Sequence, residues 1–233
     1  RAPKHGNEAG TSDQVRSYFD QVAGRWSAHY APEGQMRGRI ARFVAACEES
    51  SHPDMCILDF GCGSGELARA LAEKGWRVTG CDISGEMLRN ARTASASEHV
   101  QWRALETSGG AKLPFDDASF DVAVASSVFE YISDPAASLR ELRRVLAPRG
   151  RILLTVPDMR HEVRISEENR RHNLRGRIAR WARRIKAGGE DTDYLKYSVA
   201  RFTPEEWSEI LRAAGFSPQP MQNCEGPLLL LGG

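Results

Sequence analysis

The sequence has no long apolar run and no excess of charge of one sign. Within its 233 residues no hydrophobic stretch approaches the roughly 18 residues that a membrane-spanning helix requires, and the first 13 residues lack the apolar core of a signal peptide. Lys and Arg together number 32, against 31 Asp and Glu, which argues against a nucleic-acid binder that acts through bulk charge. With 41% hydrophobic and 27% charged residues, the chain is predicted to fold as one large domain or two small ones, without nucleic acid as a partner.

Paired cysteines and metal-ligand motifs are also missing. The five cysteines are odd in number and none has a C-x-x-C partner, so neither a disulfide framework nor a zinc site is expected. The six histidines are scattered, without an H-E-x-x-H or similar pair, and no metal cofactor is predicted. This cysteine usage indicates a reducing compartment, and we therefore expect a cytoplasmic protein.

Strand-like and helix-like patterns alternate from residue 55 onward. Before them, 12–50 shows helical spacing of apolar residues and is predicted to form an N-terminal helical cap, preceded by a mobile tail at 1–11. The remainder, 51–233, is predicted to be an α/β core with a doubly wound, mostly parallel sheet, because such alternation produces right-handed crossover units. The predicted strands of the alternating part are 55–60, 77–81, 100–105, 121–125 and 151–156, and the predicted helices are 66–74, 85–96 and 136–146.

Residues 158–200 interrupt this alternation with a polar, Arg-rich stretch that is predicted to be a helical lid inserted after the fifth strand. Within 160–186 ten Lys or Arg stand against three Glu, and apolar residues recur at helical spacing over 173–186, which predicts a basic amphipathic helix. Such a helix either packs on the sheet with solvated arginines, or contacts an anionic acceptor or, peripherally, an anionic membrane surface. A helix from Thr203 to Gly215 and an edge hairpin complete the predicted fold, with hairpin strands at 217–224 and 227–231.

The most informative motif is the strand–turn–helix pattern at 57–68, I-L-D-F-G-C-G-S-G-E-L-A. Its glycines at 61, 63 and 65 allow the backbone to turn sharply and to approach a ligand closely, and the helix behind them offers free N–H groups. Asp82 stands at the end of the next predicted strand, where a carboxylate accepts hydrogen bonds from ribose hydroxyls. A glycine turn beside an ordinary surface aspartate is the alternative, but the strand, turn, helix and Asp82 together indicate a nucleotide-binding site.

The glycine spacing distinguishes two kinds of nucleotide. A dinucleotide fingerprint reads G-x-G-x-x-G, whereas this turn reads G-x-G-x-G and continues with Glu66. A negative side chain at the start of the helix disfavours two phosphates and tolerates a ligand without phosphate. An NAD-type oxidoreductase is therefore the alternative interpretation and not the main one.

Four segments, in order, make the sequence resemble the class I S-adenosylmethionine-dependent methyltransferases of the methyltransferase type 11 group. They are I-L-D-F-G-C-G-S-G at 57–65, V-T-G-C-D-I-S at 78–84, L-P-F-D-D-A-S-F-D at 113–121 and L-R-R-V-L-A-P-R-G-R-I-L-L-T-V-P at 142–157. The resemblance implies a seven-stranded sheet whose last strand is antiparallel and lies between two others. It implies S-adenosylmethionine as cofactor, S-adenosylhomocysteine as product, and O- or N-methylation of a small-molecule or lipid-linked acceptor. A cofactor-binding module without catalysis stays open as a further alternative.

The resemblance also implies cofactor contacts for particular residues. Those implied at the methionine end are Asp59, which supports the turn, and Gly61, Cys62, Gly63, Gly65, Ser126 and Ser127, with Tyr18 and Arg37 of the cap as contacts to the carboxylate. Those implied at the nucleoside end are Asp82 on the ribose diol, Ile83 and Met87 beside the adenine, and Glu106 with Thr107 near its amino group.

No residue is predicted firmly as a catalyst. Many members of the group carry His after the fourth strand, where this chain has Glu130 and Tyr131. Together with His29 and His161, these are the candidate general bases if the acceptor is a hydroxyl, whereas an amine or an activated carbon needs no dedicated base. An aromatic stripe in the cap is expected to cover the cofactor and exclude water, or else to be ordinary core packing: Tyr18, Phe19, Trp26 and Tyr30.

Overall fold

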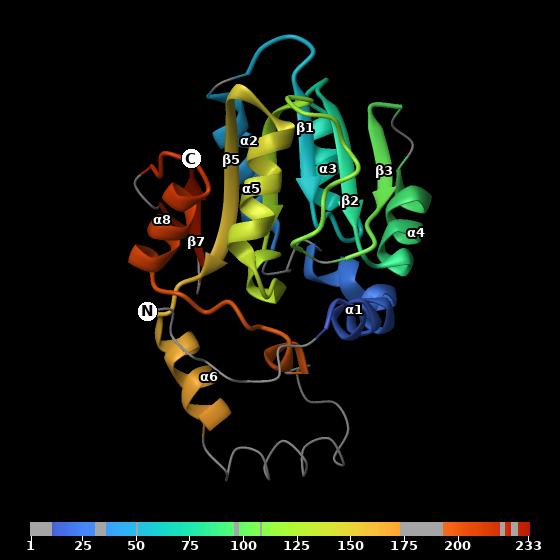
Figure 1. The fold of residues 1–233 in the computed structure, drawn as a ribbon. Helices are drawn as coiled ribbons and strands as arrows, with labels where there is room; N and C mark the ends of the chain where they lie inside the picture. Colours follow the sequence, from blue (N-terminus) through green and yellow to red (C-terminus); the bar gives the residue numbers. More distant parts are fainter. Residues whose placement is uncertain are drawn as a thin grey trace.

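The computed structural model describes residues 11–30, 36–49, 51–95, 98–107, 109–172, 193–219, 222–224 and 228–233. The predicted tail lies outside these residues except for Thr11, and the predicted basic helix at 173–186 lies outside them entirely. In the described part, Figure 1 shows a central sheet with helices on both faces and a third group of helices beyond one end of the strands. This arrangement confirms the predicted α/β fold class.

The described strands form one seven-stranded sheet in the order β3-β2-β1-β4-β5-β7-β6. Neighbouring strands from β3 to β5 are parallel, and β7 runs antiparallel between β5 and β6. The last strand is therefore antiparallel and inserted between two others, as the resemblance implied. The strands are β1 (Cys56–Phe60), β2 (Arg77–Asp82), β3 (Val100–Ala104), β4 (Phe120–Ser126), β5 (Leu146–Pro157), β6 (Gln222–Cys224) and β7 (Leu228–Gly232).

Strand β5 begins earlier than the sequence predicts. Leu146 already pairs with Phe120 of β4, and the register shifts between Phe120 and Val122. Pro148 therefore lies inside the strand, where an irregular stretch of pairing tolerates a residue that has no N–H to donate. From Ile152 to Pro157 every residue of β5 is buried, as in a central strand covered on both faces.

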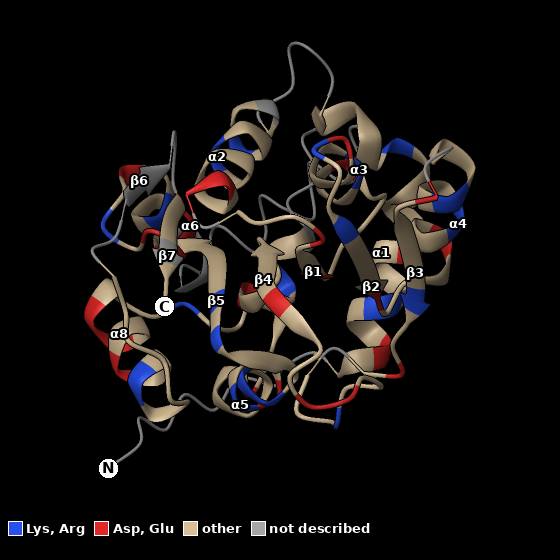
Figure 2. Cartoon of the chain, turned by 90° about the horizontal axis from the view of Figure 1, so that it is seen from above, with Lys and Arg blue, Asp and Glu red and all other residues tan. Residues whose placement is uncertain are grey.

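Two layers of helices enclose the sheet (Figures 1 and 2). Helices α2 (Arg37–Glu48) and α3 (Glu66–Ala72) cover one face, where their apolar side chains join one buried cluster with β1 and β4. Helices α5 (Pro135–Val145) and α8 (Pro204–Ala213) cover the other face in a second cluster. As predicted, Thr203 caps α8 ahead of Pro204, and it forms a capping box with Glu206. Figure 2 shows basic and acidic residues interspersed along the outer helices, in keeping with the balanced charge.

A third group of elements lies beyond the carboxyl ends of the parallel strands (Figure 1). It contains α1 (Ser12–Trp26), followed by the short η1 (Ser27–Tyr30), and the described parts of the 158–200 insertion. These parts are α6 (Glu162–His172) and η3 (Asp193–Lys196). Helix α4 (Gly85–Ala94) packs beside β2 and β3 and contacts α1. Since ligands of doubly wound sheets bind at the carboxyl ends of the strands, these elements surround the candidate site.

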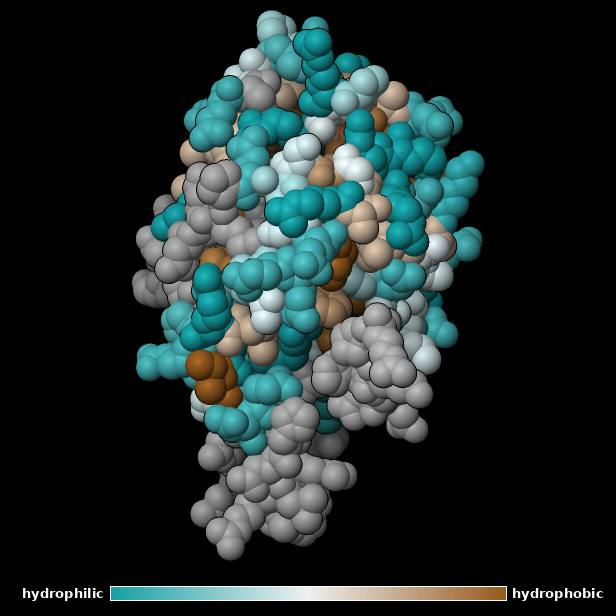
Figure 3. All heavy atoms as spheres, turned by 60° about the vertical axis from the view of Figure 1, so that its left-hand side comes forward, coloured by the Kyte–Doolittle hydropathy of each residue, from teal (hydrophilic) through white to brown (hydrophobic). Residues whose placement is uncertain are grey.

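The described surface exposes two large apolar side chains, Val163 and Ile165, both on α6. The face shown in Figure 3 is mostly hydrophilic, with small and separate apolar areas. Among the described helices none is long and apolar enough to cross a membrane.

Candidate functional site

The turn after β1 adopts a conformation that requires glycine. Gly61, Gly63 and Gly65 have φ values of +72°, +53° and +83°, which L side chains rarely adopt. Space imposes a second constraint, since a Cβ on Gly61 would lie 2.3 Å from Val128 Cγ2 and one on Gly65 would lie 2.4 Å from Trp102 Cη2. The backbone of this turn is therefore closely surrounded by the chain, and it leads directly into α3.

Asp82 connects this turn to the end of β2. Its Oδ2 accepts a hydrogen bond from the Gly63 N–H and its Oδ1 accepts one from the Ser84 N–H, both at 2.8 Å. Burial raises the pKa of Asp82, and the N–H groups that donate to its carboxylate oppose this shift. The predicted ribose-binding carboxylate thus lies beside the glycine turn, as the motif requires.

Asp59 lies beneath the turn and is 1% exposed. Its Oδ2 has no hydrogen-bond partner among the residues that the structure describes. Burial, with the nearby charges of Asp82 and Glu66, raises the pKa of Asp59 to about 8. A buried carboxyl group with one unsatisfied oxygen is costly unless it is protonated or meets a ligand, which makes Asp59 the polar group of this turn that a ligand would most relieve.

The thiol of Cys62 is buried within the turn, and burial raises the pKa of Cys62 well above its usual range. The same holds for Cys81 at the end of β2. Both thiols therefore stay protonated, and neither has the exposed, electropositive surroundings of a reactive cysteine.

The predicted nucleoside contacts follow the neighbouring strands β2 and β3. Ile83 is half-buried directly after Asp82, and Met87 is buried against Tyr18 and Val22 of α1. Glu106 and Thr107 follow β3 and line a pocket of about 320 Å³.

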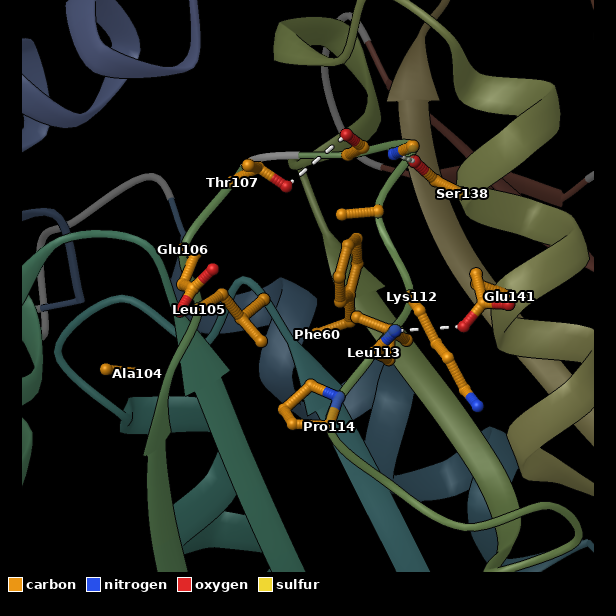
Figure 4. Close-up of a pocket in the computed structure, with 13 residues that line it drawn as sticks. Phe60, Ala104, Leu105, Glu106, Thr107, Lys112, Leu113, Pro114, Ser138 and Glu141 are labelled. Carbon is orange, nitrogen blue, oxygen red and sulfur yellow. Dashed lines mark hydrogen bonds between the residues drawn. The ribbon is translucent and has the colours of Figure 1, made fainter.

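Figure 4 shows this pocket between the 105–114 loop and α5, with Phe60, Leu105 and Leu113 pointing into it. The loop is fastened to α5, because Gly110 N donates to Ser138 Oγ at 3.1 Å and Leu113 N donates to Glu141 Oε2 at 2.9 Å. The described residues of this loop therefore add a pocket behind Glu106 that both apolar and polar side chains line.

Aromatic rings of the cap, of the segment after β4 and of the insertion contact one another, and one of them lies on the glycine turn. A Cβ on Gly63 would lie 3.4 Å from Trp26 Nε1, so the indole rests on the turn. Ring centroids are 5.6 Å apart for Phe19 and Trp26, 5.1 Å for Phe19 and Tyr131, and 5.1 Å for Tyr18 and Tyr197. We call these five residues, Tyr18, Phe19, Trp26, Tyr131 and Tyr197, the aromatic enclosure. They come from α1, from the segment after β4 and from the segment after η3.

The methionine end shows a difference from the expected cap contacts. Tyr18 packs on Met87 at the nucleoside side, and the Arg37 side chain lies outside the described residues. Arg39 instead donates from Nη1 to Ser127 Oγ at 2.8 Å, beyond the end of β4. Sequence reasoning missed Arg39, although it stands one helical turn before the fully buried Phe43 and so shares the inward face of α2.

The other residues expected at the methionine end lie where β4 leaves the sheet. Ser126 is the last residue of β4, and Ser127 has a positive φ of +57°. The Ser127 N–H donates to Thr155 Oγ1 on β5 at 2.9 Å. Tyr30 is close to Arg39 and Glu66, and burial raises the pKa of its phenol well above the usual range.

Glu130, one of the candidate bases, belongs to a buried polar network. Glu130 is 3% exposed, its Oε2 accepts from Ser198 Oγ at 2.9 Å, and its carbonyl accepts from the N–H groups of Val199 and Ala200. Burial raises the pKa of Glu130, and the charge of Arg164 on α6 opposes that shift. In this arrangement Glu130 holds the insertion against the end of β4.

The other three candidate bases have different surroundings. Tyr131 belongs to the aromatic enclosure, and burial raises its pKa well above the usual range, which keeps the phenol protonated. His161 Nδ1 accepts from the Val163 N–H at 3.3 Å and so caps α6. His29 is exposed, with its ring 5.2 Å from that of Trp26. Within the described part of the chain, no His, Cys, Asp or Glu residues cluster as metal ligands would.

Comparison with known proteins relates this geometry to a family. The family described as a methyltransferase domain matches residues 58–154. A malonyl-[acyl-carrier protein] O-methyltransferase from Serratia marcescens is 34% identical over 149 residues, which cover 64% of this chain and 54% of that protein. A demethylmenaquinone methyltransferase from Streptomyces avermitilis is 27% identical over 219 residues, which cover 94% of this chain and 92% of that protein. The chain thus spans about half the length of the first of these curated relatives.

Solved structures share the fold along most of the chain. The [4+2]-cyclase SpnF has a TM-score of 0.68 at 24% identity, with 92% of this chain and 75% of that chain covered. A SAM-dependent methyltransferase from Aquifex aeolicus has a TM-score of 0.60 at 16% identity, with coverages of 93% and 96%. At these identities the likeness shows the fold alone, and one fold can serve more than one reaction.

Proposed function

Because residues 58–154 make this chain a member of the class I S-adenosylmethionine-dependent methyltransferases, in the methyltransferase type 11 group, we propose that it methylates a small-molecule or lipid-linked acceptor. The observation that carries the proposal is the connection of the glycine turn to Asp82 through the Gly63 N–H at 2.8 Å. A carboxylate fixed beside a turn that only glycine can form is the recognition unit for a nucleoside.

The residues of the site fit S-adenosylmethionine. Positive φ at its three glycines lets the backbone of the turn approach a ligand closely. The Oδ2 of Asp59 beneath it, which has no partner among the described residues, suits a ligand that carries an amino group. Asp82 would hold the ribose diol, Ile83 and Met87 would pack beside the adenine, and Glu106 with Thr107 would meet its amino edge. Bound there, S-adenosylmethionine would supply a methyl group on a sulfonium for in-line displacement.

At the methionine end, Arg39 would attract the carboxylate. Its guanidinium already lies at Ser127, and a fixed planar cation suits a carboxylate better than the Tyr18 phenol on the nucleoside side does. Arg39 therefore replaces Tyr18 in this role in our proposal, and Ser126 and Ser127 keep theirs.

The aromatic enclosure suggests which acceptors the site binds and how the reacting atoms are kept from water. Its rings are large and uncharged, so they would bind apolar or flat parts of an acceptor and exclude water from the reacting atoms. Exclusion of water favours methyl transfer to a nucleophile whose charge is lost in the reaction. Tyr131 stays protonated, so it can donate a hydrogen bond but does not serve as a base near neutral pH.

Such a site suits an acceptor that arrives ionised or needs no deprotonation. The names of two relatives, which mention a malonyl-acyl-carrier protein and demethylmenaquinone, agree with small-molecule or lipid-linked acceptors. The excess of basic residues in 160–186 extends the proposal to acceptors that bear negative charge.

The proposal is tested by methyl transfer from radiolabelled S-adenosylmethionine to a panel of acceptors. The panel contains a quinol, an acyl-carrier-protein-bound carboxylate, a phenol and an amine, and each reaction is repeated with Asp82→Asn. Label transfer that falls strongly in the variant supports the proposal. Tight binding of S-adenosylhomocysteine without transfer to any acceptor would favour a non-catalytic binding module, and preferential binding of NAD would favour an oxidoreductase.

A further inference from the structure

Arg16 of the cap helix α1 spans the two segments that follow β2 and β3. Its Nε donates to the carbonyl of Ile83 at 3.2 Å, and its Nη2 donates to the carbonyl of Glu106. Strands β2 and β3 are neighbours, with Asp82 paired to Ala104, so the two carbonyls lie at adjacent strand ends. One guanidinium therefore connects both walls of the proposed nucleoside subsite.

A second contact, one helical turn along α1, fixes the position of Arg16. Asp20 Oδ1 accepts from Ser84 Oγ at 2.6 Å and from the Glu86 N–H at 3.2 Å, at the start of α4. Further along, Asn90 Nδ2 of α4 donates to the Ala23 carbonyl at 2.9 Å. The cap helix is thus fastened along the nucleoside side of the site by polar contacts from both of its halves.

We propose that Arg16 is a cofactor-contacting residue that closes the nucleoside subsite, and that the cap closes in response to the nucleoside and not to the amino-acid part of the cofactor. This inference rests on the proposed function. The guanidinium is held by these two carbonyls and, through Nη1, by Asp13 Oδ1 at 3.1 Å. A planar group fixed in this way stacks favourably on an aromatic face such as a purine. Since its anchors are the main chain at Ile83 and Glu106, ordering of those two segments by a bound purine also orders the cap.

A purely structural role makes a different prediction. If Arg16 only fastened α1 to the core, its loss would destabilise the cap equally with and without ligand, and affinity for a nucleoside would change little. If Arg16 also contacts the purine, its loss weakens every ligand that carries the nucleoside by a similar factor. The amino-acid part of the ligand is then irrelevant to the effect.

The test uses 5′-methylthioadenosine, which contains the nucleoside without the amino acid, alongside S-adenosylhomocysteine and methionine. Affinities are measured by calorimetric titration, and hydrogen exchange is followed in 12–26. The variant Arg16→Met keeps much of the side-chain stem but has no donors, and Arg16→Lys keeps the charge but offers a single ammonium group. Arg92→Met, on an exposed position of α4, is the matched control.

We expect 5′-methylthioadenosine alone to slow exchange in 12–26, and methionine alone to leave it unchanged. Arg16→Met should weaken the binding of 5′-methylthioadenosine and of S-adenosylhomocysteine by a similar factor, between about 2 and 30, the loss expected for a cation stacked on an aromatic face. Arg16→Lys should lie in between, and Arg92→Met should leave both affinities unchanged. Unchanged affinities in Arg16→Met, or cap protection that requires the amino-acid part, would overturn the inference. Failure of the wild-type protein to bind S-adenosylhomocysteine would instead overturn the proposed function.

Discussion

Asp82→Asn tests the ribose assignment with little change in shape. In the structure the two carboxylate oxygens of Asp82 each accept one backbone N–H, from Gly63 and from Ser84, at 2.8 Å. Asn keeps one oxygen acceptor and presents an NH₂ group to the other position, so one N–H loses its partner and the ribose loses a charged acceptor. A hydrogen bond to a charged group contributes roughly 1.5–3 kcal/mol, which corresponds to a loss of about 10- to 150-fold in cofactor affinity.

The assay for Asp82→Asn is calorimetric titration with S-adenosylhomocysteine, accompanied by chemical unfolding of the free protein. Unfolding separates the loss of folding stability from the loss of cofactor affinity, because the unpaired N–H should also cost about 1–3 kcal/mol of stability. Asp116→Asn, at an exposed position, is the control and should change neither quantity. Because burial raises the pKa of Asp82, we also expect wild-type affinity to fall on acidification as this carboxylate becomes protonated. A folded Asp82→Asn protein with wild-type affinity would show that Asp82 does not hold the ribose.

Three further predictions concern the same region and the insertion. Asp59 has a pKa of about 8 in the folded protein, so the folded state keeps a proton that the unfolded state loses, and the wild type becomes less stable as pH rises. From about pH 5 to about pH 8, the free energy of unfolding of Asp59→Asn in urea should therefore rise relative to that of the wild type by up to about 1.4 kcal/mol per pH unit. A constant difference between the two proteins over this range would contradict the prediction. Gly65→Ala and Gly75→Ala should each lose about 1–2 kcal/mol of stability, because both positions have positive φ. Gly65→Ala should lose more, because of the two only Gly65 faces Trp102. Equal losses would show that the clash with Trp102 has no cost. Replacement of Arg177, Arg180 and Arg184 by Glu should reduce turnover or binding to anionic vesicles. Wild-type behaviour in both assays would favour the alternative for the helix predicted at 173–186, in which its arginines are only solvated.

The sequence predicted the sheet well because its signals are local. Short apolar runs predict buried strands, and a following glycine or proline marks where each run ends, as Gly61 does after residues 57–60 and Pro157 does after residues 151–156. The positions of the glycine turn and Asp82 were predictable for the same reason, since each follows a strand whose end is visible in the sequence. Strand β5 was predicted too short because pairing with Phe120, a distant residue, extends it through Pro148.

The polar residues around the site were harder to predict. Arg16 and Asp20 flank the buried stripe of Val15, Tyr18 and Val22, and polar residues beside such a stripe usually face solvent. Their contacts join segments more than 60 residues away, which no local pattern records. Glu130 was predicted as a candidate base from its place after β4, yet its partner Ser198 comes from the far end of the insertion. The catalytic assignments therefore stay predictions, whereas the fold is confirmed.

A crystal structure with S-adenosylhomocysteine would locate the cofactor on this chain. We expect the ligand to lie across the carboxyl ends of β1 and β2, with its ribose hydroxyls on Asp82, its purine between Ile83 and Glu106, and Arg16 beside the purine. We expect its amino group to lie over the glycine turn above Asp59, with Arg39 at the carboxylate. A ligand bound elsewhere, or ribose hydroxyls that make no contact with Asp82, would show that the glycine turn and Asp82 are not the cofactor site.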